Sequence, residues 1–414
     1  MRACVHRGTH EIGGSCIEVE HQGWTLVLDM GLPLEARPHE KAPVPNVRAF
    51  HARDRSRVAV LLSHGHPDHY GLIGTAPSDV PVYLGEATQR ILREAQFFAP
   101  IGADINAAGH LRDRQPTEFG PFTITPYLVD HSAFDSYALL VEAGGRRLMY
   151  SGDIRATGRK AGLFDRFLAD PPGGVDVLLL EGTSIGREPA ARTLSEHDVE
   201  QRCVELFRDT DEMVLACYSG QNIDRLVTLH RAARRSGRRL VLDLYAAEVA
   251  RATGRPETIP QGDWDSVGVY VPRSQRVRVK QTAQFERVDR VRARRIYPED
   301  LAGQASQLVM TFRSSMCSEL EAAECLDGAH AIWSMWPGYL DQPSSRPLLT
   351  WLEERGIPLT LLHASGHASP DDLRRYAAAV AAKQVVLVHT CHPERFAPLV
   401  DNVQTRQDGE WWEI

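Results

Sequence analysis

Three histidines and one aspartate lie within six residues of the sequence, in the segment Ser63-His64-Gly65-His66-Pro67-Asp68-His69. Neutral imidazole and carboxylate groups are the ligands that Zn²⁺ and neighbouring first-row metals prefer in proteins. The pair His64 and His66 can direct two rings at one ion, and Asp68 and His69 are placed to serve a second. The alternative is a His-rich polar loop that binds nothing, but such a loop needs no ligand density of this kind. The segment therefore predicts a metal site.

Three more residues of ligand type follow apolar segments elsewhere in the chain. They are His131 after Val129-Asp130, Asp153 after Ser151-Gly152, and His389 after Leu387-Val388. The carboxyl ends of strands are where α/β-type sheets gather their functional side chains. Each residue alone could equally be a hydrogen-bonded structural residue. Together with the His-rich loop, they predict a converging set of metal ligands.

Apolar strands separated by short turns must position these residues in the first third of the chain. The expected hairpins and strands are 16–20 with 24–29, 58–63, 122–129, 137–142 with 147–150, and 175–180. A helix is expected from about Glu86 to Phe98, and the continuous apolar run 175–180 is typical of a strand buried on both faces.

After Thr183 the pattern changes to strict alternation of helices and strands, which is typical of a doubly wound parallel sheet. The expected elements are 196–208, 213–218, 222–236, 239–244, 307–312, 319–326 and 330–335. The chain then returns through a strand 358–363, a helix 371–382, and strands 384–389 and 409–414. We expect a domain at 186–345 inserted into a first domain built from 1–185 and 346–414.

The composition is that of an ordinary globular protein of 414 residues, 43% hydrophobic and 24% charged, long enough for two to three domains. No apolar stretch approaches the length of a membrane-spanning helix, so we expect no membrane partner. The first residues lack the apolar core of a secretory signal. Seven scattered cysteines, never spaced C-x-x-C, favour free thiols in a reducing cytoplasm.

Basic residues are concentrated in two segments although the net charge is −7. The segment 273–295 carries nine arginines and lysines against two acidic residues, and 231–239 carries five arginines. Such patches suit a phosphate backbone, but a solvated helix face in an arginine-rich protein explains them as well. Charge alone leaves both interpretations open.

With these motifs, the sequence resembles the metallo-β-lactamase superfamily, and within it the β-CASP nucleases, most closely the bacterial ribonuclease J group. Asp29 in Leu28-Asp29-Met30-Gly31 matches the first superfamily motif, and the His-rich loop matches the second. The remaining matches are His131, Asp153, Glu181 in Leu-Glu-Gly-Thr, His367 in Ser-Gly-His, and His389. The resemblance implies an α/β fold, a metallo-β-lactamase αββα sandwich with an inserted doubly wound β-CASP domain. The chain stops soon after His389, so we expect no counterpart of the C-terminal domain of ribonuclease J.

The resemblance also implies the cofactor and the roles of the ligands. Two Zn²⁺ ions, or Mn²⁺ in their place, would be held by His64, His66 and His131 on one side and by Asp68, His69 and His389 on the other, with Asp153 between them. The ions would share a hydroxide that attacks phosphorus and leaves a 5′-phosphate and a 3′-hydroxyl. Asp68, His367 and Glu181 form the implied catalytic set.

Three roles stay open between a functional and a simpler interpretation. Asp29 either orients a ligand by hydrogen bonding from behind or only forms the turn before Gly31. His367, oriented by Glu181, either gives a proton to the leaving oxygen or clamps the scissile phosphate. Ser369 either joins Ser365 and Gly366 in a phosphate cradle or caps the helix that follows it.

Two further groups are expected to contact RNA. Ser314 and Ser315 resemble the serine-rich strand-end turn that lines the nucleotide groove of this family. Arg292, Arg294 and Arg295 would form part of a basic track beside the site.

We therefore expect a metal-dependent ribonuclease that acts on single-stranded RNA, as an exonuclease, an endonuclease or both. A β-CASP DNA nuclease is the alternative, although RNA-acting members carry His at the position of His389 where DNA-acting ones tend to carry Val. A small-molecule metallo-hydrolase would lack the inserted domain and the Ser-Gly-His motif, and a non-catalytic subunit would have lost ligands. A homodimer is one assembly that the resemblance allows.

Overall fold

The computed structural model describes residues 1–36, 42–99, 102–187 and 193–414, and within them the chain forms two compact units. The first, which we call the sandwich unit, comprises Met1–Arg93, Ile101–Thr193 and Gly366–Ile414. The second, the inserted unit, comprises Glu94–Pro100 and Leu194–Ser365. Both chain ends therefore belong to the sandwich unit.

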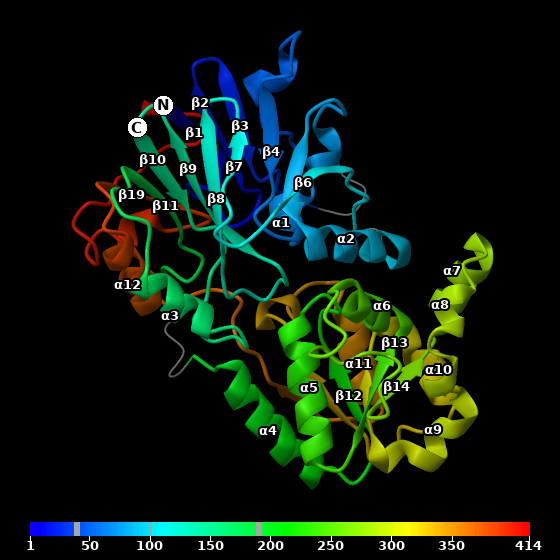
Figure 1. Cartoon of the computed structure of the whole chain (residues 1–414). Coiled ribbons are helices and arrows are strands. Elements are labelled where there is room, and N and C mark those ends of the chain that lie inside the picture. Colours follow the sequence, from blue (N-terminus) through cyan, green and yellow to red (C-terminus); the bar gives the residue numbers. More distant parts are fainter. Residues whose placement is uncertain (37–41, 100–101, 188–192) are drawn as a thin grey trace. The chain divides into compact units, whose positions relative to one another are not determined.

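Two mixed sheets form the centre of the sandwich unit (Figure 1). The first sheet has the order β20-β1-β2-β3-β4-β5-β6, with β1 Arg2–Arg7, β2 Cys16–His21, β3 Trp24–Leu28, β4 Val58–Leu61, β5 Val82–Gly85, β6 Ala107–Leu111 and β20 Trp411–Glu413. The second has the order β19-β11-β10-β9-β8-β7, with β7 Thr117–Phe119, β8 Phe122–Leu128, β9 Tyr137–Ala143, β10 Arg146–Tyr150, β11 Val177–Glu181 and β19 Gln384–Val388.

Burial on both faces of the second sheet explains why β9, β11 and β19 are largely apolar. In β9, Leu139 and Val141 pack into the core between the two sheets. Ala138 and Leu140 point the other way, into a core shared with helices α3 (Gly162–Ala169) and α12 (Pro370–Val380). The outer face of the first sheet packs in a separate core that includes residues of α1 (Pro67–Tyr70) and α2 (Glu86–Phe98). These layers confirm the predicted helix-sheet-sheet-helix sandwich.

A parallel sheet of order β15-β14-β13-β16-β12-β17-β18 forms the centre of the inserted unit. Its strands are β12 Val214–Cys217, β13 Arg239–Asp243, β14 Val267–Tyr270, β15 Arg295–Ile296, β16 Leu308–Thr311, β17 His330–Trp333 and β18 Leu359–Leu361. Its helices are α4 Glu196–Asp209, α5 Ile223–Arg235, α6 Leu244–Ala252, α7 Arg273–Thr282, α8 Glu286–Asp289, α9 Pro298–Gln304, α10 Cys317–Ala322 and α11 Arg346–Glu354.

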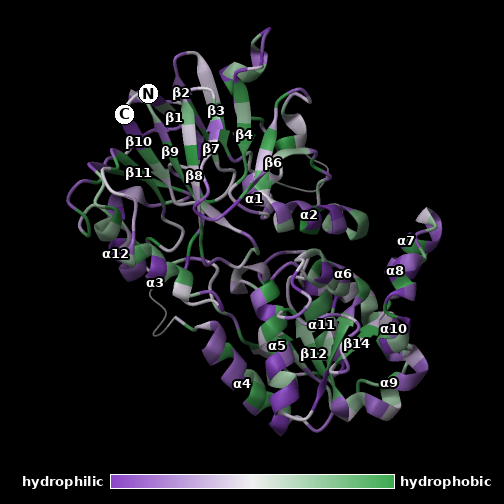
Figure 2. Cartoon of the chain, viewed as in Figure 1, coloured by the Kyte–Doolittle hydropathy of each residue, from purple (hydrophilic) through white to green (hydrophobic). Residues whose placement is uncertain are grey.

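Helices cover both faces of this sheet, as the alternating pattern predicted. Residues of α4, α5 and α6 share one core with the sheet, and residues of α9, α10 and α11 share the other. Hydrophilic and hydrophobic residues alternate along α4 and α5, as expected of helices with one face on a sheet (Figure 2). The inserted unit is therefore doubly wound.

The return to the sandwich unit comes later in the chain than the sequence indicated. The segment from 346 contains α11, which packs in the core of the inserted unit, and β18, which pairs with β17 through Ala331↔Leu359 and Trp333↔Leu361. The chain changes units only at Ser365/Gly366. Periodicity identified the strand but could not tell which sheet it joins, because both sheets accept a short apolar strand at an edge.

None of the helices in the described ranges is long and apolar enough to cross a membrane. The seven cysteines are all free thiols.

Candidate metal centre

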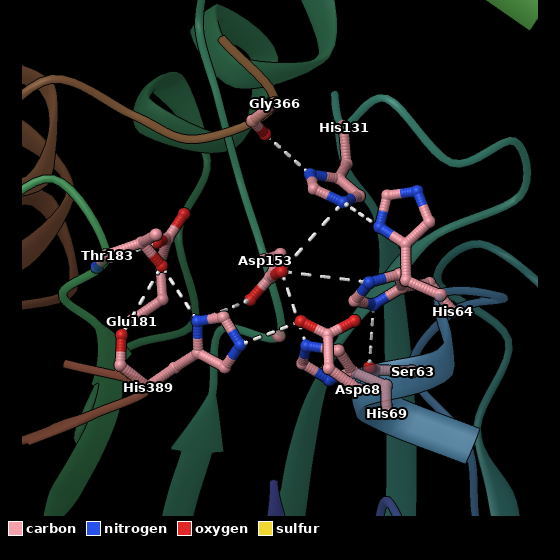
Figure 3. A network of polar contacts seen from close by, with 12 residues as sticks. Ser63, His64, Asp68, His69, His131, Asp153, Glu181, Thr183, Gly366 and His389 are labelled. Carbon is pink, nitrogen blue, oxygen red and sulfur yellow. Dashed lines mark hydrogen bonds and ion pairs between the residues drawn. The ribbon is translucent and has the colours of Figure 1, made fainter. Parts of the chain in front are cut away.

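The predicted ligands converge at one edge of the sandwich unit, where several strands end (Figure 3). The loop after β4 and the short helix α1 supply His64, His66, Asp68 and His69. His131 follows β8, Asp153 follows β10, Glu181 ends β11 and His389 follows β19. His367 comes from the segment that precedes α12.

The carboxylate of Asp153 lies at the centre of the cluster and is 1% exposed. Its Oδ2 lies 3.2 Å from His69 Nε2, 3.7 Å from His64 Nε2 and 3.9 Å from His131 Nε2. His367 Nδ1 lies 3.7 Å from the same oxygen, and His389 Nδ1 lies 3.9 Å from Oδ1. Five imidazoles therefore surround one carboxylate, with gaps longer than most hydrogen bonds.

Ligand atoms fall into three groups that could each hold an ion. These groups are His64, His66, His131 and Asp153; Asp68, His69 and His389; and Asp153, Glu181, His367 and His389. Within them, His131 Nε2 lies 3.0 Å from His66 Nδ1, and His389 Nε2 lies 3.2 Å from Asp68 Oδ2. The first two groups bring together the residues that the resemblance assigns to the two ions, with Asp153 in the first group.

Several buried polar atoms of the cluster fit a divalent cation. His64 Nε2, His69 Nε2 and both carboxylate oxygens of Asp153 are buried and have no hydrogen-bond partner among the residues that the structure describes. Leaving such atoms unsatisfied costs about 1–3 kcal/mol each, more for a charged group. Burial lowers the pKa of His64 and of His131, so both imidazoles are neutral and can donate a lone pair. Buried, neutral imidazoles around a carboxylate are the donor set of a metal site.

Hydrogen bonds at the far nitrogen of four histidines select the tautomer that leaves Nε2 facing the cluster. The Nδ1 of His131 donates to the carbonyl of Gly366 at 2.6 Å, and the Nδ1 of His69 donates to Asp29 at 2.8 Å. His64 Nδ1 lies 3.0 Å from Ser63 Oγ, and His389 Nδ1 lies 2.8 Å from Thr183 Oγ1. Such partners fix ring orientation and raise ligand basicity in metal sites.

Asp29 is completely buried and holds the His-rich loop through hydrogen bonds. Its carboxylate accepts hydrogen bonds from the Ser63 amide, the Ser63 hydroxyl, His69 Nδ1 and the Tyr150 hydroxyl, at 2.7–2.8 Å. Its backbone has φ +61°, a conformation that aspartate tolerates better than most residues. The side chain therefore lies where an orienting role needs it, in contact with a predicted ligand.

His367 and Glu181 form a pair beside the cluster. His367 Nδ1 lies 3.2 Å from Glu181 Oε2, and the amides of Ile154 and Thr183 donate to the same carboxylate. Burial opposes a charge on His367, but the carboxylates of Glu181 and Asp153 outweigh it and raise the pKa of His367. The side chains of His367 and Asp68 keep 21% and 15% of their surface exposed, whereas His64, His69 and His131 are sealed. A substrate can therefore reach the cluster on the side of His367 and Asp68.

Among the residues of the predicted phosphate cradle, Ser369 is the one for which the structure shows a structural role. Its hydroxyl caps α12 by accepting from the Asp372 amide at 3.1 Å, and Pro370 occupies the first helical turn. Gly366 approaches the His131 loop so closely that a Cβ would lie 2.8 Å from Ser132 Oγ. Ser365 is the last residue of the inserted unit.

The predicted RNA-contacting residues lie in the inserted unit at two different places. Ser314 and Ser315 are exposed in a short turn after β16, at the carboxyl edge of the sheet. Arg294 instead pairs with Asp265 and donates to the carbonyl of Asp263, both of which precede β14. Arg292 lies in the same turn, and the guanidinium of Arg295 stacks over Tyr297 at 4.6 Å. The structure therefore does not bring the arginines together with the serine turn.

Sequence reasoning missed the residues that support the ligands. The sequence indicates only strand or turn positions for three residues that each contact a candidate ligand or Asp29. These residues are Ser63, Tyr150 and Thr183. A buried ion pair, Arg155 with Asp130, also stands behind His131, with Nε and Oδ1 3.3 Å apart. Their only sequence signal is position, since each lies within three residues of a predicted motif residue.

Comparisons with known proteins agree with this fold. A family model described as beta-lactamase superfamily domain matches residues 38–216. The ribonuclease J of Mycobacterium tuberculosis is 28% identical over 261 residues, covering 58% of this chain and 44% of the relative. The ribonuclease J of Pyrococcus abyssi is 23% identical over 411 residues, covering 92% and 88%. A crystal structure of a protein of unknown function from Enterococcus faecalis V583 superimposes with a TM-score of 0.78 over 99% of both chains, at 22% identity.

The chain thus spans less than half the length of the Mycobacterium tuberculosis relative, and most of the length of the archaeal one. The sequence similarity and the fold point to the same superfamily.

Proposed function

We propose that this chain, which belongs to the metallo-β-lactamase superfamily and is similar to ribonuclease J, is a metal-dependent ribonuclease of the cytoplasm. The observation that carries the proposal is the buried ring of imidazoles around Asp153, open toward His367 and Asp68. His64, His66 and His131 would hold one divalent cation and Asp68, His69 and His389 a second, with Asp153 between them. Bound there, Zn²⁺ or Mn²⁺ would make water nucleophilic at neutral pH and offset charge on a phosphoryl oxygen.

His367 is the proposed proton donor to the 3′-oxygen that leaves phosphorus. Its Nδ1 lies 3.2 Å from Glu181 Oε2, and the carboxylates of Glu181 and Asp153 raise the pKa of the imidazole, which favours the protonated form that a proton donor needs. Ile154 and Thr183 hold the Glu181 carboxylate through their amides, so the donor is oriented before substrate arrives. Hydrolysis in this sense leaves a 5′-phosphate and a 3′-hydroxyl.

RNA is the proposed substrate because the relatives that cover most or half of this chain carry the name ribonuclease J. A single-stranded polymer also suits a largely buried cluster with a few partly exposed members, since a flexible strand can present one phosphate to it.

The test uses purified protein of known metal content with 5′-monophosphorylated single-stranded RNA and the matching DNA, each labelled at either end. We expect metal-dependent cleavage of RNA, and the products distinguish release of mononucleotides from internal cuts. Asp153→Asn should lose both metal and cleavage. His367→Gln should keep its metal and lose cleavage. Metal-loaded protein that cleaves neither polymer, or that prefers DNA, would contradict the proposal.

A further inference from the structure

Two exposed aromatic rings lie at the carboxyl edge of the sheet in the inserted unit. Trp336 precedes and Tyr339 ends the short turn Pro337–Tyr339 that follows β17, and the two residues keep 44% and 41% of their surface exposed. Their ring centroids are 5.4 Å apart with the planes at 87°, an edge-to-face pair. Rings of this size are normally buried, so an exposed pair in mutual contact indicates a binding surface.

The turn holds the indole of Trp336 in one orientation. A Cβ added at Gly338 would lie 2.3 Å from the ring, so the benzene edge packs directly on the glycine backbone. The carbonyl of Trp336 accepts from the Trp333 indole at 3.3 Å, and the carbonyl of Tyr339 accepts from Ser345 Oγ at 2.7 Å. The rings are therefore placed before a ligand binds, and little side-chain entropy is lost on binding.

A buried arginine, Arg225, links the segments that follow β17 and β18 through hydrogen bonds. Arg225 is fully buried and pairs with Glu196 at 2.9 Å. Its Nη1 donates to the carbonyl of Ser334 at 2.7 Å and to that of Leu362 at 3.3 Å. Those two carbonyls follow β17 and β18, which pair side by side. Arg225 thus fixes the backbone at Ser334, two residues before Trp336.

Two features near the rings favour a polyanionic ligand with planar groups. Arg346 follows Ser345, is exposed, and makes no hydrogen bond or ion pair within the described residues. The second feature is the sequence distance: five residues separate His367 from β18, and β18 pairs with the strand that precedes the rings.

The exposed apolar area at these strand ends is too small for a stable protein–protein interface. Trp336, Tyr339 and Leu361, at 48%, are the large exposed apolar side chains at these strand ends. A fully exposed aromatic side chain offers about 150–250 Å², so at less than half exposure the three side chains together offer roughly 250 Å², well below the ~800 Å² per partner of a stable complex.

We propose that Trp336 and Tyr339 form a stacking platform for bases of single-stranded RNA, with Arg346 contacting a neighbouring phosphate. The platform deepens the proposed function and rests on it, since it assigns a second contact for the same substrate. Base–aromatic stacking tolerates any sequence, because every base has a π-face.

The test measures binding without cleavage, by anisotropy of a labelled oligoadenylate with EDTA present. Trp336→Ala should weaken binding about tenfold at unchanged dependence on salt, and Trp336→Phe should retain most of the affinity. Arg346→Gln should reduce the salt slope by about 0.7, the value for one phosphate contact. Phe285→Ala, which removes a ring exposed to 54% elsewhere in the unit, is the matched control and should change nothing.

An oligonucleotide with abasic sites at successive positions sharpens the result. Removal of the stacked base should weaken binding to the wild type but cost nothing further with Trp336→Ala. Unchanged affinity of Trp336→Ala for RNA that the wild type binds would overturn the platform and leave the ribonuclease proposal standing. A change in oligomeric state of Trp336→Ala, measured by light scattering, would show a contact between copies instead. A wild type that neither binds nor cleaves RNA would defeat the ribonuclease proposal itself.

Discussion

His389 Nε2 lies 3.2 Å from Asp68 Oδ2, although 321 positions of the sequence separate the two residues. The contact joins the loop after β4 to the end of β19, and both side chains belong to one of the three ligand groups. Because β4 and β19 belong to different sheets, the candidate site depends on the packing of the two sheets against each other.

Removing this imidazole should empty one of the two ion positions. We expect His389→Gln to lower the metal content from about two ions per chain to about one, because three protein ligands are the usual minimum for a tightly held ion. Mass spectrometry of the purified protein measures the stoichiometry. His330→Gln is the control, since His330 bonds Thr360 at a strand start and lies outside all three ligand groups. Full occupancy in His389→Gln would remove His389 from the ligand set.

Tyr150→Phe should weaken metal binding through Asp29. The Tyr150 hydroxyl donates to the carboxylate that also holds His69, so its loss leaves His69 less well oriented. We expect about a tenfold loss in metal affinity and about 1 kcal/mol in the free energy of unfolding.

The control for this change is Tyr376→Phe. The Tyr376 hydroxyl is also buried but has no hydrogen-bond partner in the described part of the chain, so its removal should be neutral or stabilising in urea denaturation. Equal effects of the two substitutions would show that Asp29 does not transmit the contact.

Two arginines of α5 pair with glutamates of α4 and differ in burial. Arg225 and Glu196 are fully buried, whereas Arg235, which pairs with Glu200 at 2.9 Å, has 42% of its side chain exposed. Arg225→Met should cost about 3–5 kcal/mol in the free energy of unfolding, because it strands a buried charge. Arg235→Met should cost about 1 kcal/mol or less. Chemical denaturation measures both, and similar losses would contradict the role given to burial.

His230 should make the protein less stable in mild acid. Burial, with Arg234 and Arg231 nearby, lowers the pKa of His230 to about 4. The neutral ring contacts Ser266 Oγ at 2.8 Å and the edge of Trp264. Because the unfolded chain takes up this proton near pH 6.5 and the folded one only near pH 4, stability falls as the pH drops between these values.

The measurement is the difference in unfolding free energy between wild type and His230→Gln across pH 4 to 7. The loss of stability on acidification should be smaller in His230→Gln, and parallel curves would contradict the assignment. Comparing the two proteins cancels the contribution of the histidines in the candidate metal centre.

Much of the fold follows from patterns that repeat along the chain. The helix predicted at 196–208 is observed as Glu196–Asp209, because apolar residues at helical spacing and a Ser195 cap define it locally. The ligands were found for a similar reason, since His131, Asp153 and His389 each follow a strand and strands of one sheet end at one edge.

The parts that sequence could not supply depend on distant partners. β18 belongs to the inserted unit because it pairs with β17. The residues Leu359–Leu361 alone do not indicate which sheet the strand joins. Tyr150 looks like a core aromatic until Asp29, from another sheet, is seen against its hydroxyl. The Trp336–Tyr339 pair likewise needs the structure, because exposure of a tryptophan cannot be read from its neighbours in sequence.

The pairing of β11 with β19 also sets an order of events during synthesis. A ribosome makes the residues up to Asp153 long before His389, and the segment Leu194–Ser365 of the inserted unit emerges between β11 and β19. A nascent chain can therefore assemble the His64, His66, His131 group while the His389 groups are still missing. If the chain cleaves RNA as proposed and cleavage needs both groups, the nascent chain cannot cut the messenger RNA that encodes it.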